Sequence, residues 1–187
     1  MAKDFRVYNR LLTLLKGMNE PFISLRPEDN FTGFDVVFTD MELRGRNVFQ
    51  TKGVDEFRLK QLVRSKNSEK IVVGIDPGPT PGVATLANNV VIDKRSIYDV
   101  GEIRHYVSKV RRECEFSSFL IKVGNGDRRY RNEIIRSLVD FRLQIVDERG
   151  SSRTIKRGED FGSAINIALS DDILSDHFFH FGLLLRA

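Results

Sequence analysis

Apolar and polar positions follow two periods along this chain, and together they predict a mixed α/β fold. Short runs rich in β-branched residues predict strands, whereas apolar residues three or four positions apart predict helices. Helices are expected at 4–17, 54–65, 99–112, 130–139 and 160–169, with a last one in the tail from residue 171. Strands are expected at 22–25, 35–39, 71–75, 83–87, 90–92, 116–123 and 143–146.

The order of these elements predicts two domains. Residues 1–66 are expected to form a small α/β accessory domain of helix, strand, strand and helix, without a catalytic constellation. A polar connector leads into a second domain, residues 70–187. Its three short successive strands predict an antiparallel meander, and alternating helices and strands follow them.

The stretch Lys70–Asn88 is the most informative in the sequence. Its first strand ends on a carboxylate, Asp76, and the proline- and glycine-rich turn 77–82 follows at once. An acid held at a rigid strand end, beside small residues, can meet a cation or a phosphate. The alternative is that Asp76 only accepts hydrogen bonds from backbone amides of the turn.

Charge and cysteine content limit the classes of partner and the cellular compartment that we expect for this protein. The net charge of +4 is compatible with a nucleic-acid partner, although many enzymes of small metabolites share it. The single cysteine, Cys114, excludes an intrachain disulfide and a cysteine metal cluster, and it favours a reducing cytoplasm. No apolar run approaches the roughly 20 residues that a membrane span needs, so we expect no membrane partner.

Three acids occupy special positions in the second domain. Asp76 ends its first strand, Glu148 follows its fifth, and Asp160 begins the next helix. If these ends share one edge of the sheet, three carboxylates converge into a site suited to Mg²⁺ or Mn²⁺. The alternatives are that Glu148 pairs with Arg149 at the surface and that Asp160 is a plain helix cap.

Basic residues are expected around these acids. They follow the fourth and fifth strands of the second domain, and a basic rim around an acidic centre suits a nucleic-acid backbone. The alternative is a solvated loop. The residues are Arg128, Arg129, Arg149, Arg153, Lys156 and Arg157.

Three motifs in this order resemble one known family. GIDPG at 74–78, VDERGSS at 146–152 and DFGSAINIAL at 160–169 resemble the RuvC-like branch of the ribonuclease H-like fold. The resemblance extends over Lys70–Ser170 and is greatest to the YqgF-type group, which is associated with Holliday-junction resolution and pre-ribosomal-RNA processing. An archaeal group with an N-terminal extension is similar in general pattern.

The resemblance implies a fold and an activity. It implies a ribonuclease H-like mixed five-stranded sheet flanked by helices, with the small N-terminal α/β domain added. It also implies a nuclease that hydrolyses phosphodiesters of structured DNA or RNA, with Asp76, Glu148 and Asp160 as catalytic residues and ligands of Mg²⁺ or Mn²⁺. Relatives form homodimers, and the apolar tail 178–185 would serve as an interface or as a core helix.

The chain departs from the RuvC pattern at two positions. RuvC has a glutamate at the end of its fourth strand, where this chain has Val123–Gly126 and the nearest acid is Asp127. RuvC also has a second acid in its last helix, where the spacing from Asp160 gives Ser163. The alternative that the protein is a non-catalytic nucleic-acid-binding or assembly module therefore remains open. Sugar-kinase and chaperone ATPase relatives need a duplicated domain, for which this chain has no room.

Overall fold

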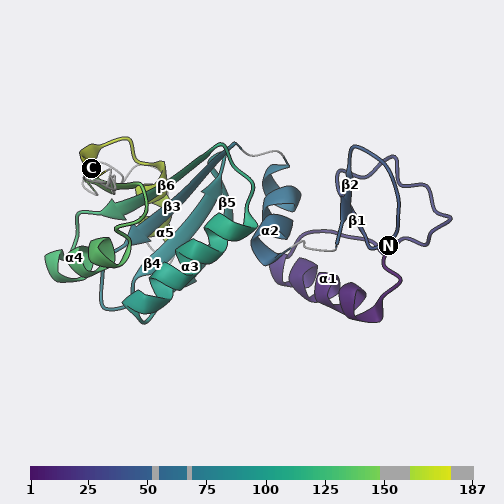
Figure 1. Ribbon diagram of the computed structural model, residues 1–187, viewed down its shortest axis with the longest axis horizontal. Helices are drawn as coiled ribbons and strands as arrows, with labels where there is room; N and C mark the ends of the chain where they lie inside the picture. The colour runs from purple at the N-terminus through teal and green to yellow at the C-terminus, as the bar shows by residue number, and fades with distance from the viewer. Residues whose placement is uncertain (52–54, 67–68, 148–160, 178–187) are drawn as a thin grey trace, which may run out of the picture. The chain divides into compact units, whose positions relative to one another are not determined.

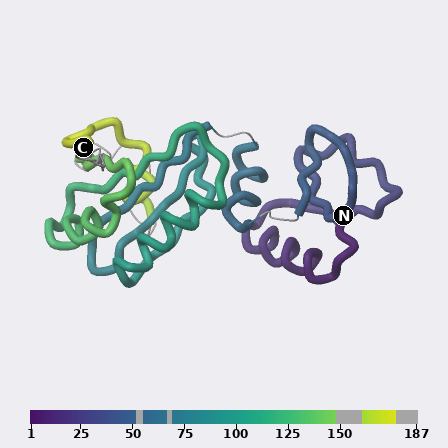
Figure 2. Tube along the Cα trace, viewed as in Figure 1, coloured from purple at the N-terminus to yellow at the C-terminus, as the bar shows by residue number. Residues whose placement is uncertain are grey.

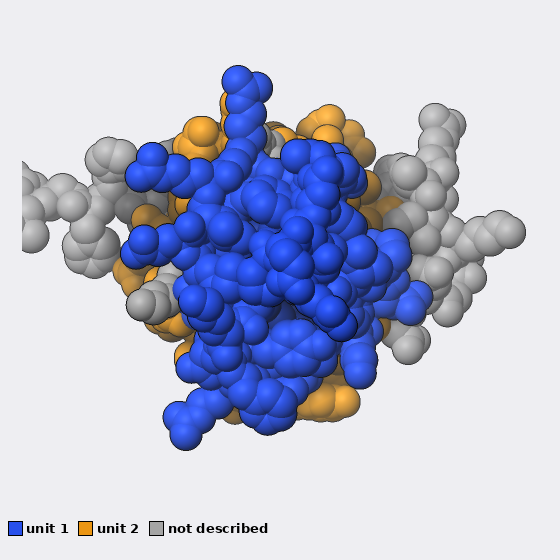
Figure 3. All heavy atoms as spheres, turned by 90° about the vertical axis from the view of Figure 1, so that its right-hand side faces the viewer, with its two compact units in different colours: residues 1–67 blue, residues 68–187 orange. Residues whose placement is uncertain are grey.

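The computed structural model describes residues 1–51, 55–66, 69–147 and 161–177. The chain folds as two compact units, Met1–Asn67 and Ser68–Ala187, which Figure 3 colours separately. We call them the first and the second unit and describe each by itself.

The described residues of the first unit form two helices and a pair of short strands. Helix α1 (Phe5–Met18) begins after Asp4, whose side chain accepts a hydrogen bond from the backbone N–H of Arg6. Strands β1 (Val37–Thr39) and β2 (Val48–Gln50) pair in parallel, and helix α2 (Glu56–Ser65) follows. The apolar faces of these elements form one core, whose buried members are Met18, Phe38, Leu59 and Leu62.

One strand prediction for the first unit was wrong, and one strand was not predicted. Residues 22–25 have no strand structure, because none of the described segments pairs with their backbone; the hydroxyl of Tyr8 contacts that of Ser24 at 3.0 Å. This segment lines an apolar cavity of about 460 Å³ within the unit. Strand β2 was not predicted, since its three residues carry too short a pattern.

The second unit is built on one mixed sheet of six strands in the order β5-β4-β3-β6-β7-β8 (Figures 1 and 2). The first three strands along the chain form the predicted antiparallel meander. Strands β6 and β7 then add in parallel to β3, and β8 closes the edge in the antiparallel direction. The strands are β3 (Lys70–Asp76), β4 (Gly82–Ala87), β5 (Val90–Ser96), β6 (Ser118–Gly124), β7 (Leu143–Val146) and β8 (Ile173–His177).

Helices cover both faces of this sheet (Figure 1). Helices α3 (Val100–Glu113) and α4 (Arg128–Ser137) contact each other and lie on one face, and α5 (Gly162–Leu169) packs on the other. The predicted cap of α3 is confirmed, because Asp99 accepts a hydrogen bond from the N–H of Gly101. No described helix is long and apolar enough to cross a bilayer.

The tail and the strand number differ from expectation. Over the described residues the sheet has six strands rather than five, because the tail begins with β8 and not with a helix. Strand β8 forms where β7 offers it a free edge: Gln144 pairs with Asp176 in the register, and their side chains are hydrogen-bonded at 3.1 Å. The apolar stretch 178–185, expected as interface or core helix, lies outside the described residues.

Candidate functional site

Asp76 lies at the carboxyl end of β3, in the middle of the sheet. Strands β3, β6 and β7 are parallel, so their carboxyl ends share one edge, which we call the carboxyl edge. The next residues form a turn that contains Pro77, Pro79 and Pro81, and the register resumes with Asp76 opposite Gly82. Because proline fixes φ, this turn is stiff. Asp76 is therefore held half-buried at a rigid point that solvent still reaches.

Helix α5 packs against β3 on the face that carries Asp76. Gly74 is two residues before Asp76 on this face, and a Cβ at Gly74 would lie 2.1 Å from the carbonyl oxygen of Ala164. Only glycine permits so close an approach of the two backbones. The approach brings Ser163, in the first turn of α5, to Asp76. We call these two residues the Asp76 site.

The electrostatics of the Asp76 site have two opposing causes. Burial raises the pKa of the Asp76 carboxyl group above its ordinary value, because a charged carboxylate loses solvation there. A hydrogen bond from the side chain of Ser163 works in the other direction by stabilising the charged form. A partly buried acid of this kind is a frequent feature of functional sites.

The structure places one of the three predicted acids. Glu148 and Asp160 lie outside the described residues. Beside Asp76, β6 ends in Gly124, and Asp127 is the cap of α4, where it accepts hydrogen bonds from the N–H groups of Arg129 and Tyr130 at 2.8 and 3.4 Å. Among the described residues, no three His, Cys, Asp or Glu side chains come together as ligands for a metal ion.

Two of the six predicted basic residues are described. Helix α4 begins earlier than predicted, so Arg128 and Arg129 lie in its first turn, and both are exposed. This turn follows β6 at the carboxyl edge, on the strand next to the one that carries Asp76. The other four, Arg149, Arg153, Lys156 and Arg157, lie outside the described residues.

Lys94 is a further cation on the Asp76 face, and sequence reasoning missed it. It stands opposite Ala84 in the register, and Ala84 stands opposite Gly74, so all three residues share one face of the sheet. The Lys94 ammonium lies 5.5 Å from the ring centroid of Phe161, the residue before α5. The sequence of β5, three apolar residues followed by four polar ones, gave no sign that Lys94 would lie on this face.

A second lysine on this face is buried and serves the other end of α5. Lys122 stands opposite Gly74, donates a hydrogen bond to the carbonyl oxygen of Ser170 and lies 3.9 Å from a carboxylate oxygen of Asp171. Burial lowers its pKa below the ordinary value, the nearby Asp171 raises it, and Lys70 lowers it again. A cation at the C-terminus of a helix is favourable, so Lys122 helps to hold α5 against the sheet.

The opposite face of the sheet carries a buried polar network. The hydroxyl of Tyr106 donates to Asp93 at 2.9 Å and contacts the hydroxyl of Thr85 at 2.7 Å, while Arg95 donates to Asp93 at 2.9 Å. Burial, followed by the charge of Asp93, raises the pKa of Tyr106 well above its ordinary value. These groups satisfy one another beneath α3, so the network is structural.

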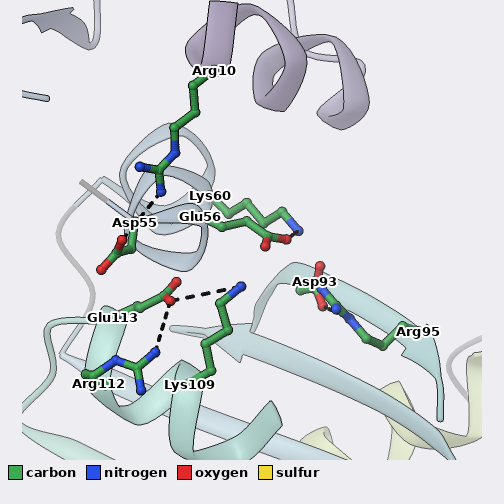
Figure 4. A network of polar contacts seen from close by, with 9 residues as sticks. All are labelled: Arg10, Asp55, Glu56, Lys60, Asp93, Arg95, Lys109, Arg112 and Glu113. Atoms are coloured by element: carbon green, nitrogen blue, oxygen red, sulfur yellow. Dashed lines mark hydrogen bonds and ion pairs between the residues drawn. The ribbon is translucent and has the colours of Figure 1, made fainter. Parts of the chain in front are cut away.

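Figure 4 shows the Asp93–Arg95 pair and a second charged group at the end of α3. There the carboxylate of Glu113 lies 4.0 Å from the ammonium of Lys109 and 3.5 Å from the guanidinium of Arg112. The same figure shows ion pairs of the first unit, Arg10–Asp55 and Lys60–Glu56. Each of these acids has a cation beside it, in contrast to Asp76, whose described partner is a hydroxyl.

Models of protein families, characterised proteins and solved structures gave no match to this chain. The arrangement of the described residues therefore carries the functional argument.

Proposed function

We propose that this protein is a Mg²⁺- or Mn²⁺-dependent phosphodiesterase that acts on structured DNA or RNA at the carboxyl edge of its sheet. The observation that carries the proposal is the position of Asp76: half-buried, at the carboxyl end of a central strand, with Ser163 beside it and exposed arginines on the neighbouring strand's helix. The proposed reaction is hydrolysis of a phosphodiester bond.

The proposed fold is ribonuclease H-like. It is supported by the sheet order β5-β4-β3-β6-β7, in which three antiparallel strands are followed by two parallel ones. It is also supported by α5, which follows β7 in the chain and crosses back over β3 and β4. Strand β8 is an addition to that pattern.

The donor chemistry of Asp76 fits a hard cation. Carboxylate oxygens are the ligands that Mg²⁺ and Mn²⁺ prefer, and a metal ion at such oxygens supplies an activated water and a charge that stabilises the leaving oxygen. Glu148 and Asp160, the residues on either side of the polar loop, remain proposed as the further ligands.

The cations at the start of α4 suit a phosphate partner. The N-terminus of a helix is its positive end, so Arg128, Arg129 and Arg131 there gain nothing from the helix dipole. An anion bound by these guanidinium groups would offset their mutual repulsion. The proposal assigns phosphate binding to Arg128 and Arg129, and to Arg149, Arg153, Lys156 and Arg157 of the loop.

The decisive experiment measures cleavage of branched DNA and of precursor RNA with Mn²⁺ for the parent protein and for Asp76→Asn. We expect the variant to lose cleavage, because the amide is a poor ligand for a hard cation. Glu69→Gln is the matched control: it removes an exposed acid just before β3, at the opposite end of the same strand. Equal cleavage by the parent and Asp76→Asn would refute the assignment.

A second candidate function is a non-catalytic nucleic-acid-binding or assembly module. The observation that favours it is the pair of uncharged residues, Gly124 and Ser163, at the two positions where the RuvC pattern has acids. This candidate predicts salt-dependent binding that survives Asp76→Asn, without metal-dependent turnover. The same cleavage and binding measurements separate the two functions.

The remaining parts of the proposal concern assembly and location. We propose a homodimer, which sedimentation of the purified protein tests, and a recognition role for the first unit. A cytoplasmic location is proposed from the single cysteine, Cys114, which is buried and forms no disulfide.

A further inference from the structure

Tyr98, between β5 and α3, is an aromatic side chain that the fold leaves in solvent. It is 80% exposed, more than any other large hydrophobic side chain that the structure describes. An aromatic ring carries a large apolar surface, and here that surface contributes almost nothing to the core. The ring is therefore accessible to a ligand that offers a flat apolar face.

The backbone on either side of Tyr98 is held in place. Before it, Ile97 is 4% exposed, and its N–H donates to the carbonyl oxygen of Pro81 at 2.9 Å. After it, Asp99 caps α3, with its side chain accepting a hydrogen bond from the N–H of Gly101. Because a core residue and a helix cap flank Tyr98, a ligand that meets the ring has little backbone to order.

The strand register places this segment at the carboxyl edge, together with Asp76. Asp76 stands opposite Gly82, and Gly82 stands opposite Ser96, the last residue of β5. Since both pairings are antiparallel, β5 runs in the same direction as β3 and ends at the same edge. Neighbouring strands lie about 4.8 Å apart, so the ends of β3 and β5 are about 10 Å apart.

Exposed guanidinium groups lie on the other side of Asp76. Strand β6 is the second neighbour of β3, and it leads into α4, whose first turn contains Arg128 and Arg129. The carboxyl edge thus presents an aromatic ring, a carboxylate and cations in this order, over about 14 Å from β5 to β6. One strand of a duplex has a phosphate about every 3.4 Å, so this length corresponds to about four nucleotides.

We propose that Tyr98 stacks on an unpaired base of a nucleic acid bound at the carboxyl edge. The arginines attract any phosphate backbone, but a ring stacks on a base only where the base is not enclosed within a duplex. The substrate class is therefore DNA or RNA with unpaired nucleotides, rather than a continuous duplex. This inference rests on the proposed function and narrows its substrate.

The first test measures binding by fluorescence anisotropy, at low salt and with EDTA to prevent cleavage. The probes are a labelled single-stranded DNA oligonucleotide, RNA of the same sequence, and the DNA duplex. Stacking on one base contributes enough that Tyr98→Ala should raise the dissociation constant for a single strand about 5- to 150-fold. Tyr98→Phe should stay near the parent value, and neither variant should alter duplex binding. Because the side chain is exposed, both should keep the thermal midpoint of the parent.

The second test places a reporter at the site. The chain has no tryptophan, so Tyr98→Trp introduces a single indole, whose fluorescence is quenched when it stacks on a base. Val90→Trp is the matched control, because Val90 is 43% exposed and begins β5 at the opposite edge of the sheet. We expect the single strand to quench Tyr98→Trp and to leave Val90→Trp unchanged.

The outcomes separate the inference from the proposed function. If Tyr98→Ala binds the single strand as tightly as the parent does, and Tyr98→Trp is not quenched, stacking is refuted and the proposed function stands. If Tyr98→Ala weakens duplex binding equally, the narrower substrate class is wrong. If the variant loses only self-association in sedimentation, the ring belongs to a protein interface and the inference fails. If the parent binds none of the probes, both proposals are refuted.

Discussion

Gly74→Ala tests the close contact on which the Asp76 site depends. The added methyl group would lie 2.1 Å from the carbonyl oxygen of Ala164, 2.7 Å from the backbone nitrogen of Ala168 and 2.8 Å from its Cβ. Two of these three atoms belong to the backbone of α5, so no side-chain rotation relieves the overlap. The helix must move outward, or β3 must bend.

The magnitude follows from packing. Inserting one methyl group into a well-packed core lowers the free energy of unfolding by about 1–3 kcal/mol. Because the neighbours here are backbone atoms, we expect a cost at the upper end of this range, about 3 kcal/mol. Replacing glycine with alanine within a strand also raises the free energy of unfolding by about 0.5–1 kcal/mol, because the unfolded chain then has less conformational freedom to lose. The expected net loss in the free energy of unfolding is therefore about 2 kcal/mol, which corresponds to roughly 8 °C in the thermal midpoint for a domain of this size.

The assay is thermal and urea unfolding followed by circular dichroism, with amide hydrogen exchange of β3 and α5 peptides to locate the weakened region. Gly78→Ala is the matched control, because a Cβ at Gly78 has no atom of the described residues within 4 Å. We expect faster exchange in β3 and α5 of Gly74→Ala and little change in Gly78→Ala. A free energy of unfolding of Gly74→Ala within about 0.5 kcal/mol of the parent value would refute the reasoning.

Two further predictions concern the network beneath α3 and the cation on the Asp76 face. Tyr106→Phe removes the hydroxyl bonded to Asp93 and Thr85 and should cost about 1–3 kcal/mol in urea unfolding. Since the pKa of Tyr106 is raised in the folded protein, the unfolded chain releases this proton near pH 10 while the folded chain keeps it. The free energy of unfolding should therefore fall as the pH rises above 10. Tyr106→Phe has no phenolic proton, so its stability should lack this part of the pH dependence. Lys94→Gln should weaken binding of a branched-DNA probe at low salt more than Lys70→Gln, which removes the same charge at the opposite edge; equal losses would contradict a local role.

Local patterns in the sequence predicted most elements of the second unit. Strand β3 follows from its β-branched run, and α3 follows from its apolar spacing and from Asp99, because these signals act within a few residues of each other. The start of α4 was misplaced by two residues, since the capping by Asp127 was not recognised. That error matters for the site, because it moves Arg128 and Arg129 from a loop into a helical turn.

Pairing between distant segments was the part that local patterns did not predict. The start of the tail was expected to be helical, yet it forms β8 because the edge of β7 offers it hydrogen-bond partners. Residues 22–25 have the composition of a strand but find no such partner in the part of the chain that the structure describes. Strand formation depends on a neighbour that can lie anywhere in the chain, so composition alone left both segments undetermined.

The sequence by itself determined that an acid, Asp76, ends a buried strand before a stiff turn, because the apolar run, the carboxylate and the prolines are adjacent in the chain. It also marked Ser163 as the residue at the position of a second acid. Only the tertiary structure decided that α5 packs on the face of the sheet that carries Asp76 and that Lys94 shares this face. The physical reason is that α5 lies nearly ninety residues after β3 in the sequence, and its place is set by the absence of a side chain at Gly74.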